Sequence, residues 1–252
     1  MTRAEVNENF RRFIQKYDTA DPKIQLKIVH TMHVADLCDA ISDSLHLNQE
    51  DRDLAWTIGM YHDVGRFEQL RLYHTFNDAQ SVNHAQLGAS LLLRGALGPV
   101  DALIVKAVAL HNVYALPELN EREQLFCDLI RDADKIDILR VNRESSVETI
   151  YDLPMAAFQQ SSISAPVMED LMQHRTVDRT HRQTAMDAIA GHISFIFGLV
   201  YPKSVQIVME QGYLRQLLDF PSENPKTKEQ LHQIDQEIDQ YVKEKIKERA
   251  EW

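Results

Sequence analysis

The dipeptide His62-Asp63 places an imidazole beside a carboxylate, two side chains that together can ligate a divalent metal ion. In a chain of 252 residues with 11 histidines, about one such pair is expected by chance. A metal site is therefore indicated only if further histidines and aspartates fall on the same apolar helix faces.

His30 and His62 both continue an apolar helix face. The first face, in a helix expected over residues 23–45, consists of Leu26, Val34, Leu37, Ile41 and Leu45. His30 occupies the missing turn of this stripe, whereas His33 lies to its side, on the surface or behind the ligands. His62 follows Leu54 and Ile58 at intervals of four residues. Each histidine taken alone is more typical of a hydrogen-bonded core residue than of a ligand.

The segment RDADKID contains three carboxylates that helical periodicity ranks. The apolar stripe of this helix consists of Phe126, Ile130, Asp134, Ile138 and Val141. Asp134 is therefore expected to point inward, flanked by Asp137, while Asp132 lies about 200° away and should be mostly solvated. A buried carboxylate needs a cationic side chain or a metal ion as partner.

Two more histidines follow the same pattern. His84 is expected in the first turn of a helix, in line with Leu87 and Leu91, and His111 at the end of another. Five metal-binding side chains on apolar faces favour one shared site over five separate core roles. Imidazole and carboxylate ligands suit Mn, Fe, Zn or Mg.

The elements that carry these residues are all expected to be helices, because the chain has only 8 Gly and 8 Pro and lacks regular turn clusters. Asp21-Pro22 is typical of a helix start, Gly65 is expected to end the third helix, and Ser81 to cap the fourth. The expected helices are 3–17, 22–45, 51–64, 82–95, 100–111, 121–142, 146–160, 165–173, 182–199, 203–218 and 227–250. Residues 66–80 are expected to form a long loop, and residues 112–120 a connection.

Composition and charge exclude several classes of protein. The formal net charge of −11 argues against a nucleic-acid partner, which needs a concentrated basic face. The longest apolar run, about 195–201, falls short of a membrane helix, and no targeting signal is evident near the N-terminus. Cys38 and Cys127 are expected to be reduced core thiols. These features predict a cytoplasmic protein.

The order of His30, His62-Asp63 and Asp134 resembles the HD-domain superfamily of metal-dependent phosphohydrolases. The resemblance covers roughly residues 24–142 and is carried by KIVHTMHVAD, GMYHDVGRFEQ and DADKID. It implies an all-α, HD-domain-like helical bundle over residues 1–145, with additional C-terminal helices over residues 146–252 that pack on the core as one globular unit.

The resemblance also implies a ligand set. It comprises His30, His62, Asp63 and Asp134, extended in the six-ligand variant by His84 and His111. One or two divalent ions (Mn, Fe, Zn, Mg or Co) are implied, with Asp63 bridging when there are two.

The implied reaction is hydrolysis of a nucleotide or a related small phosphate ester by a metal-activated water. Asp63 and Arg66 are the expected catalytic residues, and Arg66 is the best-placed cation for the substrate phosphate. The weaker candidates are Lys27, Arg71, Arg131 and Lys135, which are solvated surface charges in the alternative interpretation. Selectivity is expected from loop residues Tyr73, His74, Tyr114 and Glu118.

Two other functions stay open: a di-iron oxygenase with the same ligands, and a non-catalytic module that senses a nucleotide through its metal. The last expected helix carries an apolar stripe of Leu231, Ile234, Ile238, Val242 and Ile246. This stripe either packs on the domain or faces a second copy in a homodimer.

Overall fold

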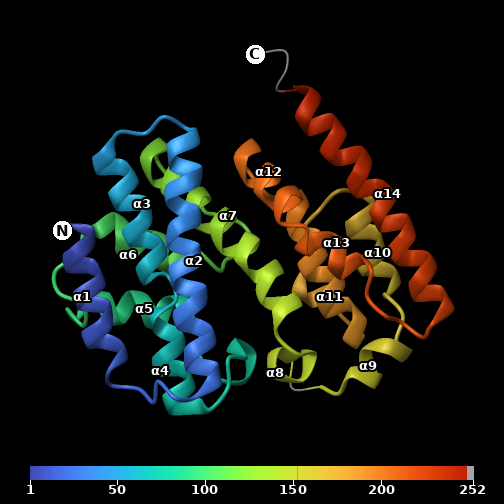
Figure 1. The fold of residues 1–252 in the computed structure, drawn as a ribbon, viewed down its shortest axis with the longest axis horizontal. Coiled ribbons are helices and arrows are strands. Elements are labelled where there is room, and N and C mark those ends of the chain that lie inside the picture. Colours follow the sequence, from blue (N-terminus) through green and yellow to red (C-terminus); the bar gives the residue numbers. More distant parts are fainter. Residues whose placement is uncertain (152, 249–252) are drawn as a thin grey trace. The chain divides into compact units, whose positions relative to one another are not determined.

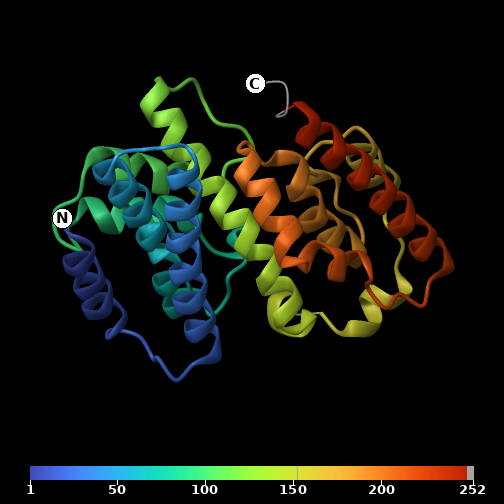
Figure 2. The same cartoon turned by 45° about the horizontal axis from the view of Figure 1, so that its top comes forward.

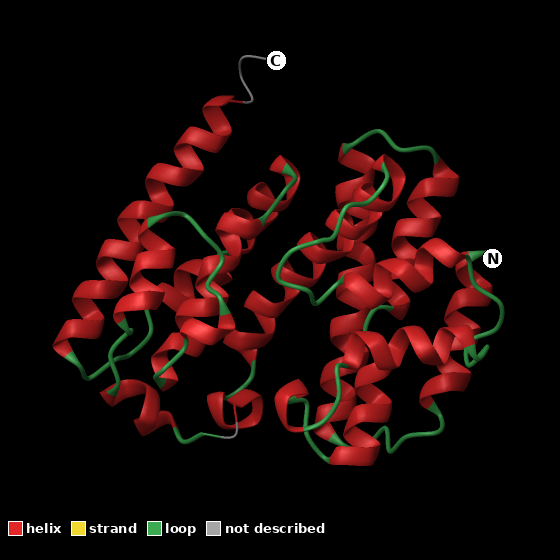
Figure 3. Cartoon of the chain, turned by 180° about the vertical axis from the view of Figure 1, so that it is seen from behind, coloured by secondary structure: helices red, strands yellow, loops and turns green. Residues whose placement is uncertain are grey.

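The computed structural model describes residues 1–151 and 153–248, with side chains up to residue 245. All regular elements of these residues are helices, and no strand is formed among them; only an isolated bridge joins Ala96 and Gly98 (Figure 3). The predicted all-α fold is confirmed. None of the described helices combines the length and the apolar character needed to cross a membrane.

The chain divides into two compact units, Met1–Asp134 and the residues from Lys135 onward. The first unit contains α1 (Arg3–Ile14), α2 (Pro22–Ser44), α3 (Gln49–Tyr61), α4 (Val64–Tyr73), η1 (Asp78–Gln80), α5 (His84–Leu93), α6 (Ala102–Leu110) and the first part of α7 (Glu121–Glu144) (Figure 1). In this division α7 contributes to both units. The predicted domain division at residue 145 and the packing of a C-terminal extension on the core stay predictions.

The core of the first unit is built on a helical hairpin. The side chain of Asp21 caps α2 by accepting from the Lys23 backbone N–H, and Pro22 follows, as the sequence predicts. α2 and α3 pack along each other (Figure 1), and α5 packs against both α4 and α6. α1 closes one side through Phe10, whose ring meets that of Phe67 edge-on at 5.9 Å between centroids.

Residues 66–80 differ from the predicted long loop. Most of the segment is helical, because α4 starts at Val64 and buries Phe67 and Leu70 against the core. Gly65 therefore does not end a helix but lies in the first turn of one. The cap of α5 is Asn83 rather than Ser81, since the Asn83 side chain accepts from the Ala85 and Gln86 backbone N–H groups.

The second unit consists of short helices and one long one (Figure 2). After the end of α7 come α8 (Val147–Tyr151), α9 (Met155–Gln160), α10 (Ala165–Met172), η2 (Arg179–His181), α11 (Ala185–Ile193), η3 (Ser194–Gly198), α12 (Pro202–Gln211), α13 (Tyr213–Leu218) and α14 (Pro225–Glu248). The predicted single helix over 203–218 is broken at Gly212, whose φ of +72° is left-handed.

Helix α14 buries the predicted stripe within the second unit. Leu231, Ile234, Ile238 and Val242 are each at most 6% exposed, while Ile246 lies outside the residues whose side chains are described. α14 packs on α10, α12 and α13. The two cysteines, Cys38 on α2 and Cys127 on α7, are buried thiols of the first unit.

Candidate metal centre

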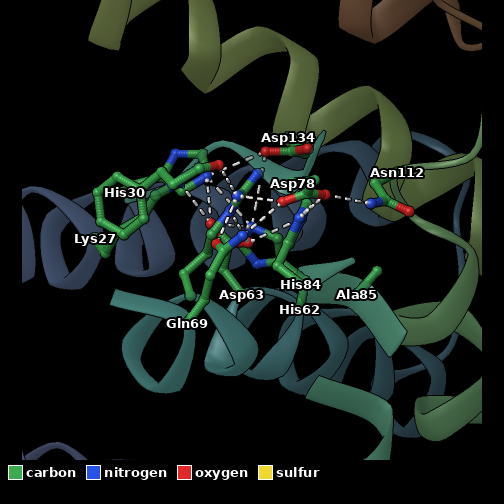
Figure 4. Close-up of polar contacts among 12 residues, drawn as sticks. Lys27, His30, His62, Asp63, Gln69, Asp78, His84, Ala85, Asn112 and Asp134 are labelled. Atoms are coloured by element: carbon green, nitrogen blue, oxygen red, sulfur yellow. Dashed lines mark hydrogen bonds and ion pairs between the residues drawn. The ribbon is translucent and has the colours of Figure 1, made fainter. Parts of the chain in front are cut away.

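Six metal-binding side chains converge where several helices of the first unit begin or end. Figure 4 labels His30, His62, Asp63, His84 and Asp134 among them. His62 is the last-turn cap of α3, Asp63 the residue before α4, His84 the first residue of α5, and His111 the cap that ends α6. His30 and Asp134 come from the middle of α2 and α7. Five of the six are at most 5% exposed, and the Asp134 side chain is 16% exposed.

Two glycines allow the helices to approach closely enough for this convergence. A Cβ built on Gly59 of α3 would lie 2.5 Å from the Cα of Ala35 on α2. A Cβ on Gly65 would lie 2.0 Å from the carbonyl oxygen of His84. Neither distance is sterically allowed, so both positions require glycine at the observed spacing. The Gly65 contact fixes the distance between the backbones that carry Asp63 and His84.

The donor atoms form two groups of three, each within 4.8 Å: His30, His62 and Asp134, and Asp63, His84 and His111. His30 Nε2 lies 3.1 Å from Asp134 Oδ1 and 3.3 Å from His62 Nε2. In the other group, His84 Nε2 and His111 Nε2 are 3.0 Å apart.

Asp63 lies between the two groups and turns one oxygen toward each. Its Oδ2 is 3.5 Å from His30 Nε2 and 3.7 Å from His62 Nε2. Its Oδ1 is 3.5 Å from His84 Nε2 and 3.8 Å from His111 Nε2. This is the orientation that a carboxylate needs in order to bridge two ions.

Hydrogen bonds fix the tautomers of three of the four histidines. His62 Nδ1 donates to the Gly59 carbonyl and His111 Nδ1 to the Val108 carbonyl, each at 2.7 Å. His84 Nδ1 donates to the Asp78 carboxylate, also at 2.7 Å. Because a carbonyl can only accept, these Nδ1 atoms carry the proton and each neutral ring presents an Nε2 lone pair to the centre.

The rings are held neutral by burial. Burial lowers the pKa of both His84 and His111 to about 4, and it also lowers the pKa of His62. The lone pairs of His84 and His111 therefore face each other at 3.0 Å with no proton between them. Such an arrangement is repulsive unless a cation lies between the donors, so the donor set fits divalent metal ions.

The carboxylates of the centre are ionised. Burial opposes ionisation of Asp63, but nearby positive charges, the Lys27 ammonium first among them, keep its pKa well below the ordinary value. Burial also opposes ionisation of Asp134, but its contacts with the histidines of the centre, the hydrogen bond from His30 first among them, together lower its pKa. Ionised carboxylates beside neutral imidazoles are the forms of these side chains that ligate divalent cations.

Lys27 and Arg66 are the two predicted substrate-binding cations that reach the centre. Lys27 Nζ lies 2.7 Å from Asp63 Oδ2. Arg66 Nε lies 3.7 Å from Asp63 Oδ1, is buried, and has no hydrogen-bond partner among the described residues. Both cations lie over the ring of Phe76, at 5.5 and 5.9 Å from its centroid.

The other predicted cations bind elsewhere. Arg71 pairs with Glu68 and is half exposed. Arg131 donates to the backbone carbonyls of Val113 and Tyr114. Lys135 donates to the Gly198 carbonyl within the second unit.

The prediction for Asp132 was wrong. Its side chain is fully buried, more so than that of Asp134. The prediction assumed that the helix has one apolar face, but the first part of α7 buries residues on more than one side, including Cys127, Leu129 and Ala133. Helical register alone therefore could not rank the two carboxylates by burial. The proximity of Asp134 to His30 and His62 separates them instead.

Three residues around the centre were not singled out from the sequence: Gln69, Asp78 and Asn112. Asp78 Oδ2 accepts from His84 and from Asn112 Nδ2, and its Oδ1 accepts from Arg66 and Gln69. Burial opposes ionisation of Asp78, yet these donors keep its pKa well below the ordinary value. No regular period marks residues 74–83, so the sequence offered no register by which to place Asp78.

Comparison with known proteins identifies the domain that holds the centre. Residues 28–139 match the family model of the HD domain, which confirms the resemblance carried by the sequence motifs. HD domains are all-α and bind divalent metal ions, and their superfamily is one of metal-dependent phosphohydrolases. No curated protein and no solved structure matched the chain.

Proposed function

We propose that this chain, which carries an HD domain of the metal-dependent phosphohydrolase superfamily, hydrolyses a nucleotide or a related small phosphate ester. His30, His62 and Asp134 would hold one divalent ion and His84 and His111 a second, with Asp63 facing both groups. Mn, Fe, Zn, Mg and Co all accept such nitrogen and oxygen ligands.

The observation that carries this proposal is the orientation of Asp63 between two pairs of histidine Nε2 atoms. A single structural ion would not require six donors divided in this way. Bound divalent ions supply Lewis acidity toward phosphoryl oxygens and lower the pKa of a coordinated water.

The side chains of the protein then have distinct roles. Asp63 holds the two donor groups in register, because each of its oxygens faces one of them. Arg66 offers the substrate its buried Nε–H, which has no partner within the described part of the chain. An unsatisfied buried donor is costly, and an anionic phosphate oxygen satisfies it. Lys27 adds a second positive charge on the Asp63 Oδ2 side.

The test is a panel of nucleotides and generic phosphate esters, assayed with protein of measured Mn, Co, Mg or Zn content. Metal-stimulated phosphate release is expected from at least one substrate, and Asp63→Asn should abolish it while the fold is retained. Metal-loaded protein without phosphate release from any member of the panel contradicts the proposal. Metal-dependent nucleotide binding without turnover would support the sensing module instead.

A second candidate is the di-iron oxygenase, favoured by the four imidazoles in the donor set, which suit iron as well as the other metals. Protein purified without oxygen distinguishes the two activities. Bound iron with an optical change on admitting O₂ would support the oxygenase, and its absence in iron-loaded protein would count against it.

A further inference from the structure

Asp78 contacts both His84 of the proposed metal centre, as Figure 4 shows, and Arg66, the proposed substrate cation. Its side chain is 17% exposed and receives hydrogen bonds on both oxygens. On Oδ2, His84 Nδ1 donates at 2.7 Å and Asn112 Nδ2 at 3.2 Å. On Oδ1, Arg66 Nη1 donates at 2.8 Å and Gln69 Nε2 at 2.9 Å. One carboxylate is thus divided between a metal-facing histidine and the arginine.

The contacts on the Oδ2 side hold two donors of one metal group. Asp78 orients the His84 ring through a direct hydrogen bond. It reaches the segment that carries His111 through Asn112, the next residue in sequence. Asn112 also donates to the side chain of Asn83, the cap of α5, which begins with His84. Asp78 is therefore attached to both of the chain segments that supply His84 and His111.

The contacts on the Oδ1 side set the orientation of Arg66. Its Nη1 is fully used, because the Phe76 carbonyl and Gln69 Oε1 accept from it as well as Asp78. With Nη1 held there, Nε is left on the side of Asp63, 3.7 Å from Oδ1. The planar guanidinium transmits this constraint, so fixing one nitrogen fixes the direction of the other.

We propose that Asp78 is a positioning residue. It fixes the orientation of the metal group that contains His84 and His111, and at the same time the direction in which the Arg66 Nε–H points. This inference rests on the proposed function for the roles of His84 and Arg66. It adds that one side chain outside the ligand set couples metal affinity to anion affinity. Asp78 is in neither group of metal-binding side chains.

The coupling is tested by binding measurements that need no turnover. Mn²⁺ affinity is measured by titration of metal-free protein, and inorganic phosphate affinity at saturating Mn²⁺. Asp78→Asn is expected to weaken one of two Mn²⁺ sites roughly 10- to 100-fold, the effect of losing an outer-shell partner. It should also weaken phosphate binding, because an amide cannot accept from His84 and hold Arg66 in the same way. Asp78→Glu, which restores the carboxylate, should recover part of both losses.

Two variants distinguish this role of Asp78 from a general stabilisation of the segment around η1. Arg66→Gln should lose phosphate affinity and keep both Mn²⁺ sites. Asn77→Ala removes the neighbouring cap of η1, which accepts from the Ala79 backbone N–H, and touches neither His84 nor Arg66. It should keep both affinities. Losses in Asn77→Ala equal to those in Asp78→Asn would overturn the proposal, as would wild-type affinity for either probe in Asp78→Asn.

A measurement on the unaltered protein covers the case in which Asp78→Asn does not fold. In the metal-free protein, where no ion occupies Nε2, long-range proton–nitrogen NMR correlations report which ring nitrogen of His84 carries the proton. A proton on Nδ1 is expected, and an unprotonated Nδ1 would overturn the proposal. Because none of these measurements uses catalysis, lack of phosphatase activity would contradict the proposed function without deciding the role of Asp78.

Discussion

At the scale of residues, the centre depends on which ring nitrogen of each histidine is already used in a hydrogen bond. The Nδ1 atoms of His62, His84 and His111 each donate to an acceptor, so the Nε2 atoms are available toward the middle. A histidine that merely filled the core would be satisfied by one bond and packing. Here one nitrogen of each ring is satisfied and the other meets another ring or a carboxylate, which indicates a role in ligation.

His30 and His33 offer a matched pair for testing this at one site on α2. His30→Asn should lower bound Mn²⁺ from about two ions per chain to about one, and reduce turnover by more than the roughly 10- to 100-fold of an outer-shell change. His33 is exposed on the same helix, so His33→Asn should keep metal content and turnover. Elemental analysis and the phosphate-release assay measure both. Equal metal content in the two variants would count against His30 as a ligand.

At the scale of elements, helix packing sets the distances between ligands. Gly65 allows α4 to contact the start of α5, and Gly59 allows α3 to contact α2. An ionic cluster also joins α1, α2 and α3, since Asp39 of α2 accepts from Arg3 of α1 at 2.8 Å and from Arg52 of α3 at 3.1 Å.

Gly65→Ala should destabilise the fold by about 2–3 kcal/mol, because the added methyl group would overlap the His84 carbonyl. It should also weaken Mn²⁺ binding, since Asp63 and His84 would be forced apart. Gly212→Ala is the control: nothing lies within 4 Å of its Cβ position, so it carries only the roughly 1–2 kcal/mol backbone cost of a positive φ. Urea unfolding measures the stability of both variants, and metal titration measures their Mn²⁺ affinity. Unchanged Mn²⁺ affinity in Gly65→Ala would contradict the packing argument.

The Asp39 cluster predicts a pH-dependent contribution to stability. Burial opposes ionisation of Asp39, but the hydrogen bonds from Arg3 and Arg52 hold its pKa below the ordinary value. A lowered pKa in the folded state adds stability above the unfolded-state value of about 4, which is lost as the pH falls further through the folded-state value. Asp39→Asn should therefore cost about 1 kcal/mol at pH 7 and progressively less below pH 4. Urea unfolding at pH 7 and pH 3 measures this; a difference that does not shrink would be evidence against it.

Much of this architecture could be predicted from the sequence, and the exceptions have physical causes. α2 was predicted because Asp21 and Pro22 mark its start and an apolar stripe follows. α4 was missed because Gly65, a residue that usually breaks helices, is needed there for close packing, and packing is not visible in local periodicity. Asp132 was misplaced because α7 has buried residues on several sides. Asp78 was missed because its function depends on contacts across the fold.

At the scale of the molecule, all six proposed ligands belong to the unit Met1–Asp134. In the described part of the second unit, no group of three metal-binding side chains comes together. A ligand that binds only the folded state stabilises what it contacts. Metal binding should therefore act on one unit.

Hydrogen exchange measures this division. With Mn²⁺ at about 100 times its dissociation constant, exchange limited by opening of the first unit should slow roughly 100-fold, in α2, α3 and α5 above all. Exchange in α12 and α14 should change much less. Equal protection of both sets by Mn²⁺ would show that the units do not open separately.

The two buried cysteines can report how often the metal-binding unit opens. Cys38 and Cys127 are both fully buried, and burial raises the pKa of each thiol, so neither reacts until the surrounding helices part. The rate at which a thiol reagent modifies the native chain therefore times the opening of that unit, without any introduced label. If Mn²⁺ slows modification of the thiols, the ratio of the two rates measures how strongly the ion stabilises the closed state.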